Sequence, residues 1–436
     1  MEKVIFNKYP TYKPSGVEWL GEIPSRWEIL PGLSFIYENK DRNKGMKRNT
    51  ILSLSYGNIR VKGEDELTGL VPESFETYQF VNKGDLIFRP TDLQNDTVSL
   101  RSSISEYEGI ITNAYLNLRF TPKSNSKFFH YFFRAIDNNK IIYGLGSGLR
   151  QNISYLDFRR FNFPFPPLPE QTAIATFLDH KTALIDKAIG IKEKQIELLK
   201  EHRQILINKA VTRGLNPNVK MKDSGVEWIG EIPEHWKVKK LKHVAGNFMY
   251  GTSIDCNELE SGTPVLRIPN IGELYINFEG LKYALLTESE TKNYLLQKND
   301  ILIVRTNGNP SLVGKSAMFS GEGDYMFASY LIRVKPKENI EAKFLINTMN
   351  SFSMRGSLTY SARTSAGNYN LNTQSLGDCY LAYPPKDEQQ GIIEFIEIAN
   401  SKITSTITLK EQEIEKLKEY KATLINSAVT GKIKVC

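Results

Sequence analysis

Two segments of the chain repeat hydrophobic residues with alternating three- and four-residue spacing, at positions 185–210 and 403–428. This spacing places apolar side chains on one stripe of an α-helix, and matching stripes on two helices predict a coiled coil. Each stripe carries two basic residues at the same positions, Lys192 and Arg203, then Lys410 and Lys421. An open alternative is that each helix packs on its own domain. The expected seam residues are Ile185, Ile189, Ile196, Leu199, Leu206, Ile403, Ile407, Ile414, Leu417 and Leu424.

The segments before these helices alternate short β-type runs with loops rich in glycine and polar residues. "NTILSLSYG", "DLIFRP" and "AYLNLRF" precede the first helix, and "PVLRIPNIG", "DILIVR" and "YLIRV" precede the second. The aromatic and apolar stretches "SKFFHYFFRAID" and "AKFLINTMN" fit helices. The pattern predicts α+β domains with a mixed β-sheet and helices.

The order of these segments reflects an internal duplication. "PSGVEWLGEIPSRW" (14–27) returns as "DSGVEWIGEIPEHW" (223–236), and "PPLPEQTAIATFLD" (166–179) returns as "PPKDEQQGIIEFIE" (384–397). Residues 183–212 and 401–430 are identical at 15 of 30 positions. We therefore divide the chain into globular domains at 1–165 and 214–383 and helical spacers at 166–213 and 384–436. The globular parts have diverged, which suggests two related modules that recognise different targets.

Composition narrows the class of protein. The chain has 436 residues, a formal net charge of +7 and a pI of about 8.9, which permits a DNA partner without requiring one. No apolar stretch approaches the ~18–20 residues of a membrane helix, and the N-terminus lacks a signal-peptide core, so we expect a cytoplasmic protein without membrane contact. The three scattered cysteines and five histidines predict neither a disulfide framework nor a metal site.

One segment, "NGNPSLVGKS" (307–316), is similar to a phosphate-binding loop. Five residues separate Gly308 from Gly314-Lys315, where a Walker A loop has four, and Pro310 removes a backbone donor. The residues that follow have a strand-and-turn pattern in place of a helix. We therefore predict a β-hairpin and no ATPase site. "IIYGLGSG" (141–148) likewise resembles an S-adenosylmethionine loop, but we interpret it as a flexible loop near DNA.

The duplicated motifs resemble those of the specificity subunit of type I restriction-modification enzymes. "FPFPPLPEQTAIATFLD" and "AYPPKDEQQGIIEFIE" are similar to its two conserved regions, and "GVEWLGEIPSRW" and "GVEWIGEIPEHW" are similar to the openings of its two target recognition domains. The second copy departs from Leu-Pro-Glu-Gln at Lys386-Asp387-Glu388-Gln389. The resemblance covers essentially the whole chain.

This resemblance implies that each globular domain recognises one half of a bipartite site in double-stranded DNA. The two helices form an antiparallel coiled coil with pseudo-two-fold symmetry, which sets the gap between the half-sites and docks two modification (methyltransferase) subunits. Methylation and cleavage then belong to those subunits and to motor-endonuclease subunits. S-adenosylmethionine, ATP and Mg are expected on these partners, with no cofactor and no catalytic residue in this chain. The absence of Asn-Pro-Pro-Tyr and Asp-Pro-Pro-Tyr from the sequence agrees with this division.

Candidate DNA-binding residues follow from the chemistry of base recognition. Arginine suits guanine, and asparagine or glutamine suits adenine, when carried on loops that reach base edges. The candidates are Arg89, Arg101, Arg150, Gln151 and Asn152 in the first domain, and Arg305, Asn307, Lys315, Arg363 and Asn368 in the second. Two other hypotheses stay open at this point: a duplicated protein–protein scaffold without DNA recognition, and a self-sufficient enzyme.

Overall fold

The computed structural model describes residues 6–55, 57–66, 74–93, 95, 100–145, 152–362 and 369–435. The chain forms two compact units, one of Met1–Lys192 with Glu411–Cys436 and one of Glu193–Lys410. Each unit contains one globular domain together with part of each long helix, so the spacers are shared between the units. None of the helices in the described ranges is long and apolar enough to span a membrane.

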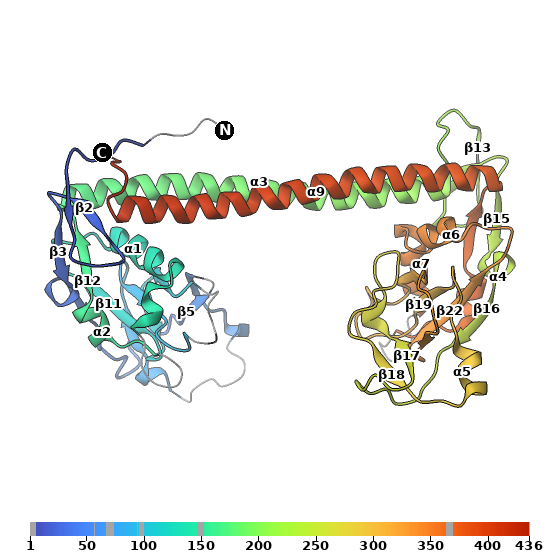
Figure 1. Cartoon of the computed structure of the whole chain (residues 1–436), viewed down its shortest axis with the longest axis horizontal. Helices are drawn as coiled ribbons and strands as arrows, with labels where there is room; N and C mark the ends of the chain where they lie inside the picture. The colour runs from blue at the N-terminus through green and yellow to red at the C-terminus, as the bar shows by residue number, and fades with distance from the viewer. Residues whose placement is uncertain are drawn as a thin grey trace. The chain divides into compact units, whose positions relative to one another are not determined.

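The two long helices are α3 (Leu168–Arg213) and α9 (Lys386–Val429). All ten expected seam residues are buried or half-buried, as the heptad pattern predicts. In the first unit Lys421 bonds Asp186 at 2.7 Å and Lys192 bonds Glu413 at 2.6 Å. Residues further along α3 therefore contact residues earlier in α9, so the two helices pair in antiparallel fashion (Figure 1).

The first unit is built around a four-stranded antiparallel sheet in the order β4-β11-β8-β9. Helix α1 (Ser126–Asn138) carries four fully buried phenylalanines, Phe128, Phe129, Phe132 and Phe133, into the same core as β8. The side chain of Asn125 caps α1 by accepting from the backbone N–H groups of Lys127 and Phe128, which fixes where the helix starts. The sheet strands are β4 (Ile36–Glu38), β8 (Leu86–Phe88), β9 (Ser102–Ile104) and β11 (Leu116–Phe120).

The second unit has the same sheet in the order β16-β22-β19-β20, again antiparallel. Helix α6 (Ala342–Met349) takes the place of α1. The predicted hairpin around the Gly-Lys-Ser segment is confirmed, because β19 pairs with β20 on either side of it. The two globular domains therefore keep one sheet topology although their sequences are barely alike. The strands are β16 (Ala245–Tyr250), β19 (Ile301–Val304), β20 (Ser316–Met318) and β22 (Leu331–Pro336).

The remaining elements are short strands and helices around these sheets, including two equivalent hairpins, β1-β2 and β13-β14, at the repeated Gly-Val-Glu-Trp segments. In the first unit they are β1 (Tyr12–Pro14), β2 (Glu22–Pro24), β3 (Glu28–Pro31), β5 (Leu52–Ser55), β6 (Asn58–Val61), β7 (Gln79–Val81), β10 (Gly109–Ile111), β12 (Asn162–Phe165) and α2 (Tyr155–Arg160). In the second they are β13 (Met221–Asp223), β14 (Glu231–Pro233), β15 (Lys237–Lys240), β17 (Thr263–Leu266), β18 (Lys282–Ala284), β21 (Met326–Phe327), β23 (Tyr380–Tyr383), α4 (Leu241–Val244), α5 (Glu288–Tyr294), α7 (Phe352–Ala362) and α8 (Thr373–Asp378).

The repeated Glu-Gln pair ties each long helix to its globular domain. Gln389 is fully buried, donates to the carbonyl of Pro384 at 3.0 Å, and accepts from the backbone N–H of Glu341, which precedes α6, at 2.8 Å. Gln171 makes the equivalent bonds in the first unit, to Pro166 and Asn125, both at 2.8 Å. Because a buried amide must find its partners inside the protein, these bonds set where the domain helix begins relative to the long helix.

In each unit a buried tryptophan packs against the glycine that follows a long helix. Gly431 follows α9 with φ of +75°, and a Cβ there would lie 2.4 Å from Pro24 and 3.2 Å from the ring of Trp27. Gly214 follows α3 with φ of +72°, and its Cβ would lie 3.1 Å from the ring of Trp236. Glycine suits both positions because the left-handed conformation and the close approach of the ring each disfavour a side chain.

Candidate nucleic-acid interface

The segments that follow β8 and β19 hold candidate DNA-binding residues in both units. The backbone N–H of Arg89 bonds the carbonyl of Arg101, and that of Val304 bonds the carbonyl of Lys315, both at 2.8 Å. Arg89 is therefore the structural equivalent of Val304, and Arg305 lies one residue further along its strand. Since successive side chains in a strand point to opposite faces, the two arginines that look equivalent in the sequence differ in direction.

Arg101 lies inside the first unit. Its side chain is fully buried, and its guanidinium donates to the carbonyls of Thr91 at 2.7 Å and Asp92 at 3.1 Å. It also lies over the ring of Tyr143, 5.6 Å from the centroid. This placement disfavours the predicted base contact, because a side chain held by internal carbonyls does not reach a groove. We assign Arg101 to holding the 89–92 segment in place.

Asn152 is exposed at the same edge of the first unit. Its side-chain oxygen accepts from the backbone N–H of Asp92 at 3.1 Å, and the next residue, Ile153, bonds the carbonyl of Pro90 at 2.9 Å. Two segments far apart in the chain therefore meet beside the half-buried Arg89. Arg150 and Gln151, which directly precede Asn152, lie outside the described residues.

The second unit brings Arg305 and Asn370 together in the equivalent place. The backbone N–H of Leu371 bonds the carbonyl of Arg305 at 2.7 Å, as Ile153 bonds Pro90 in the first unit. The Nε of Arg305 donates to the side-chain oxygen of Asn370 at 3.1 Å, and its guanidinium lies 4.2 Å from the ring centroid of Tyr250. These contacts orient a charged, fork-shaped donor at the end of β19.

A hollow of about 500 Å³ surrounds this arginine. Its lining includes Asn307, Tyr330 (57% exposed), Tyr369 and Asn370. The side-chain oxygen of Asn307 accepts from the backbone N–H of Asn309 at 2.8 Å, which stabilises the turn after β19. Polar amides, a guanidinium and exposed aromatic rings are the groups that contact bases and sugar-phosphate. Arg363 and Asn368 fall outside the described residues.

Sequence reasoning did not select Tyr330, Tyr369 or Asn370. Asn370-Leu371 repeats Asn152-Ile153 at the offset of the long helices, and that repeat was the available signal for Asn370. No repeat in the sequence indicates Tyr330 or Tyr369. These tyrosines reach the hollow only because β22 and the 369–371 segment pack beside β19.

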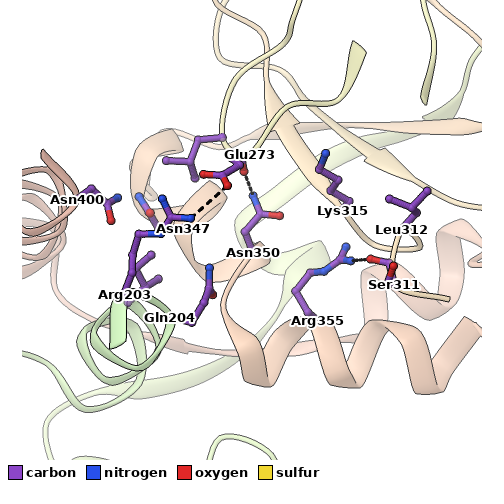
Figure 2. Close-up of a pocket in the computed structure, with 12 residues that line it drawn as sticks. Arg203, Gln204, Glu273, Ser311, Leu312, Lys315, Asn347, Asn350, Arg355 and Asn400 are labelled. Atoms are coloured by element: carbon purple, nitrogen blue, oxygen red, sulfur yellow. Dashed lines mark hydrogen bonds and ion pairs between the residues drawn. The ribbon is translucent and has the colours of Figure 1, made fainter. Parts of the chain in front are cut away.

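Lys315 lies in a different part of the second unit. Its ammonium donates to the carbonyl of Ile271 at 2.6 Å, and its side chain lines a cavity together with Arg203 and Arg355 (Figure 2). Burial and the nearby Arg355 guanidinium both lower the pKa of Lys315. As the structural equivalent of Arg101, Lys315 is likewise bonded to an internal carbonyl, so it does not join Arg305 and Asn307 in the hollow.

Comparison with known proteins matches most of the chain to one family. The family model described as type I restriction modification DNA specificity domain matches residues 50–201 and 233–419. The chain is 26% identical over 273 residues to the EcoKI specificity subunit of Escherichia coli K12, covering 62% of this chain and 57% of that protein. It is 28% identical over 294 residues to the MjaVIII specificity subunit of Methanocaldococcus jannaschii, covering 64% and 63%. The chain thus spans less than two thirds of the length of these curated relatives.

Solved structures share the fold. One chain, from a study of complex assembly and conformational transition of the type I R-M system, has a TM-score of 0.69 at 13% identity and covers 93% of this chain and 98% of its own length. The HsdS subunit from Thermoanaerobacter tengcongensis has a TM-score of 0.52 at 13% identity and covers 94% and 98%. At this identity the similarity concerns the fold, two α+β domains with paired long helices.

Proposed function

Because this chain belongs to the family of type I restriction modification DNA specificity domains, we propose that it is the DNA-recognition subunit of a type I restriction-modification enzyme. Each globular domain recognises one half of a bipartite site in double-stranded DNA. The chain contributes no catalytic group. Adenine-N6 methylation and ATP-dependent cleavage take place on partner subunits, which hold S-adenosylmethionine, ATP and Mg.

The observation that carries this proposal is the repeated junction at the end of β8 and β19. Ile153 in the first unit and Leu371 in the second each follow an asparagine, and each donates its backbone N–H to a carbonyl just beyond the strand. The other residues around that junction differ between the units. A common scaffold with different polar side chains at one edge suits two domains that recognise different base sequences. A scaffold that only joined proteins would not need an oriented Arg305 beside amides, the exposed Tyr330 and the half-buried Tyr369.

The long helices supply a surface for the modification subunits. Helix α3 exposes an apolar side chain every seven residues, outside the seam: Leu184, Ile191, Leu198 and Ile205, each 44–51% exposed. A regular apolar stripe on a solvent-facing helix is typical of a docking surface. We assign the docking of two modification subunits to the helices on this basis, and the spacing of the half-sites to the coiled coil.

The test is reconstitution with the methyltransferase subunits of the same system. The assembled enzyme should methylate a bipartite motif with a fixed gap, while the purified chain with S-adenosylmethionine should transfer no methyl group to DNA. Binding to the motif should weaken steeply with salt, because lysine and arginine contacts to phosphate release counterions. An assembly that forms but shows no sequence preference would support the scaffold hypothesis and contradict this proposal.

A further inference from the structure

The second unit contains a cationic cavity away from the candidate nucleic-acid interface. It has a volume of about 290 Å³ and lies between α3, the β19–β20 loop and the helices α6 and α7. Figure 2 shows Arg203, Lys315 and Arg355 around it, with Asn347 from α6 and Asn400 from α9 beside Arg203. The volume is roughly ten times the ~30 Å³ that one water molecule occupies in the liquid, so the cavity can hold a small molecule.

Positive charge in the cavity is poorly balanced. Glu273 is the lining carboxylate; it bonds Arg203 at 3.1 Å, and its side chain is 77% exposed. Lys315 and Arg355 donate to the carbonyls of Ile271 and Ser311. Within the described ranges, neither of these two cations forms an ion pair with a carboxylate. Burial lowers the pKa of Arg355 to about 10, as expected for a cation removed from water without a nearby anion.

Several polar atoms at the cavity have no hydrogen-bond partner among the residues that the structure describes. Two are donors, the Nη1 of Arg355 and the Nε of Arg203, and two are acceptors, the side-chain oxygens of Asn347 and Asn400. Buried polar atoms nearly always find a partner, and leaving one without it destabilises the fold. A ligand with both anionic oxygens and a hydroxyl or ester group would satisfy donors and acceptors together.

The first unit lacks this arrangement. The bonds of Gln171 to Asn125 and of Gln389 to Glu341 make Tyr131 the equivalent of Asn347. The hydroxyl of Tyr131 lies 3.2 Å from that of Thr182, which stands at the place of Asn400 in the repeat. Lys421 stands at the place of Arg203 and is neutralised by Asp186 at 2.7 Å. The first-unit counterparts of Arg203, Asn347 and Asn400 are therefore paired with each other or with a carboxylate. The unpartnered set in the second unit is thus not required by the duplicated fold.

We propose that this cavity binds a small phosphate-bearing anion, inorganic phosphate or a phosphate monoester. Arg355, Lys315 and Arg203 surround its charged oxygens, and Asn347 and Asn400 accept from its protonated oxygen or hydroxyl group. Arginine guanidinium groups match phosphate oxygens with two parallel N–H donors, and lysine adds a point charge. The Gly-Lys-Ser segment thus brings its lysine to a phosphate, although on a β-hairpin and without the loop of an ATPase. The site is independent of DNA recognition.

Calorimetric titration of the full chain with inorganic phosphate, and separately with a nucleoside monophosphate, in low-chloride buffer tests this assignment. We expect saturable binding that weakens about tenfold or more in Arg355→Gln, as for the loss of one charge-assisted hydrogen bond. Lys343→Gln is the matched control, since Lys343 pairs with Glu397 at 2.7 Å and does not line the cavity. This variant should bind like the parent chain.

A second variant separates ligand binding from folding. Asn347→Tyr places in the second unit the residue that occupies the equivalent position of the first, so the variant should fold. It removes the Asn347 acceptor and puts a ring at the cavity wall, so it should bind no phosphate. Phosphate should raise the melting temperature of the parent chain and of Lys343→Gln but not that of Asn347→Tyr. Absence of saturable binding, or equal loss in Lys343→Gln, would overturn the proposal. Displacement of phosphate by duplex DNA, with DNA binding equally weakened in Arg355→Gln, would assign the cavity to the DNA backbone and overturn it as well.

Discussion

The side-chain oxygen of Gln389 accepts a hydrogen bond from the backbone N–H of Glu341 at 2.8 Å, across 48 residues of chain. The same bond joins Gln171 to Asn125 in the first unit at 2.8 Å. Both glutamines are fully buried and also donate to a proline carbonyl five residues earlier. The glutamine of the Glu-Gln repeat is thus explained by the junction between each long helix and its domain helix.

Replacing Gln389 with alanine should destabilise the second unit by about 1–3 kcal/mol, because the N–H of Glu341 and the carbonyl of Pro384 lose a buried partner. Hydrogen exchange should report the loss in α6 and leave the first unit unchanged. Gln390→Ala is the matched control, since the neighbouring Gln390 is exposed and bonds Glu394 on its own helix. Equal destabilisation by both variants would contradict the assigned role of Gln389.

Replacing Arg305 with alanine should weaken recognition of one half-site only, by roughly 1–3 kcal/mol at one base pair if the arginine contacts a base edge. Asn152→Ala should affect the other half-site. The measurement is the methylation rate of the reconstituted enzyme on duplexes with single substitutions in each half. Lys292→Ala, on the exposed helix α5, is a control of unchanged preference. Loss of both half-sites from one substitution would rule out two independent recognition domains.

Exchanging residues ~30–160 for the matching domain of a relative should change one half-site and keep the other, since the β1-β2 hairpin and the long helices that frame the domain stay in place. Sequencing of methylated DNA from cells with the hybrid enzyme would reveal its motif. A motif altered in both halves would contradict this division of labour.

Deleting one heptad from each long helix should keep the seam in register while shortening it by about 10 Å, or ~3 bp of DNA. We expect the same two half-sites with a narrower gap in the methylated motif. Deleting four residues from each helix is the control, because it breaks the heptad pattern and should impair folding or assembly. An unchanged gap after the heptad deletion would mean that the helices dock partners without setting the spacing.

Replacing Leu198 with glutamate should weaken assembly with the modification subunits, because a charge enters the exposed apolar stripe of α3. The fold should be unaffected, since Leu198 is 51% exposed and lies outside the seam. Co-purification measures the effect, with the exposed Glu201→Gln as control. Full assembly of the Leu198 variant would place the docking surface elsewhere.

The stability of the first unit should fall as pH drops from about 6.5 toward 3 through His130, whose pKa burial lowers to about 3. The unfolded chain takes up a proton on this residue in that interval and the folded chain does not. A His130→Gln variant should therefore lose less stability than the parent on acidification, as measured by melting temperature. The exposed His202→Gln serves as control. Parallel pH curves for His130→Gln and the parent would contradict the neutral state assigned to the half-buried His130.

The elements of this protein follow from local patterns in its sequence. The heptad stripes predicted the seam, and all ten seam residues are buried or half-buried. Two helices can bury apolar residues that repeat every 3.5 positions only by pairing along those stripes. The β-type runs became strands, and "SKFFHYFFRAID" and "AKFLINTMN" became α1 and α6, since periodicity and composition act over a few neighbouring residues.

The roles of the polar residues were decided by tertiary structure. Arg101, Lys315 and Arg305 are all cations beside similar strands, and all three bond backbone carbonyls, yet only Arg305 lines the open hollow with Asn370 and Tyr330. Two features explain why these three residues differ. Arg305 lies one residue further along its strand than Arg89 does, and the partners of all three side chains come from distant parts of the chain. The sequence pattern contains the side chains, but which of them meet is set by long-range packing, and local periodicity carries no information about that.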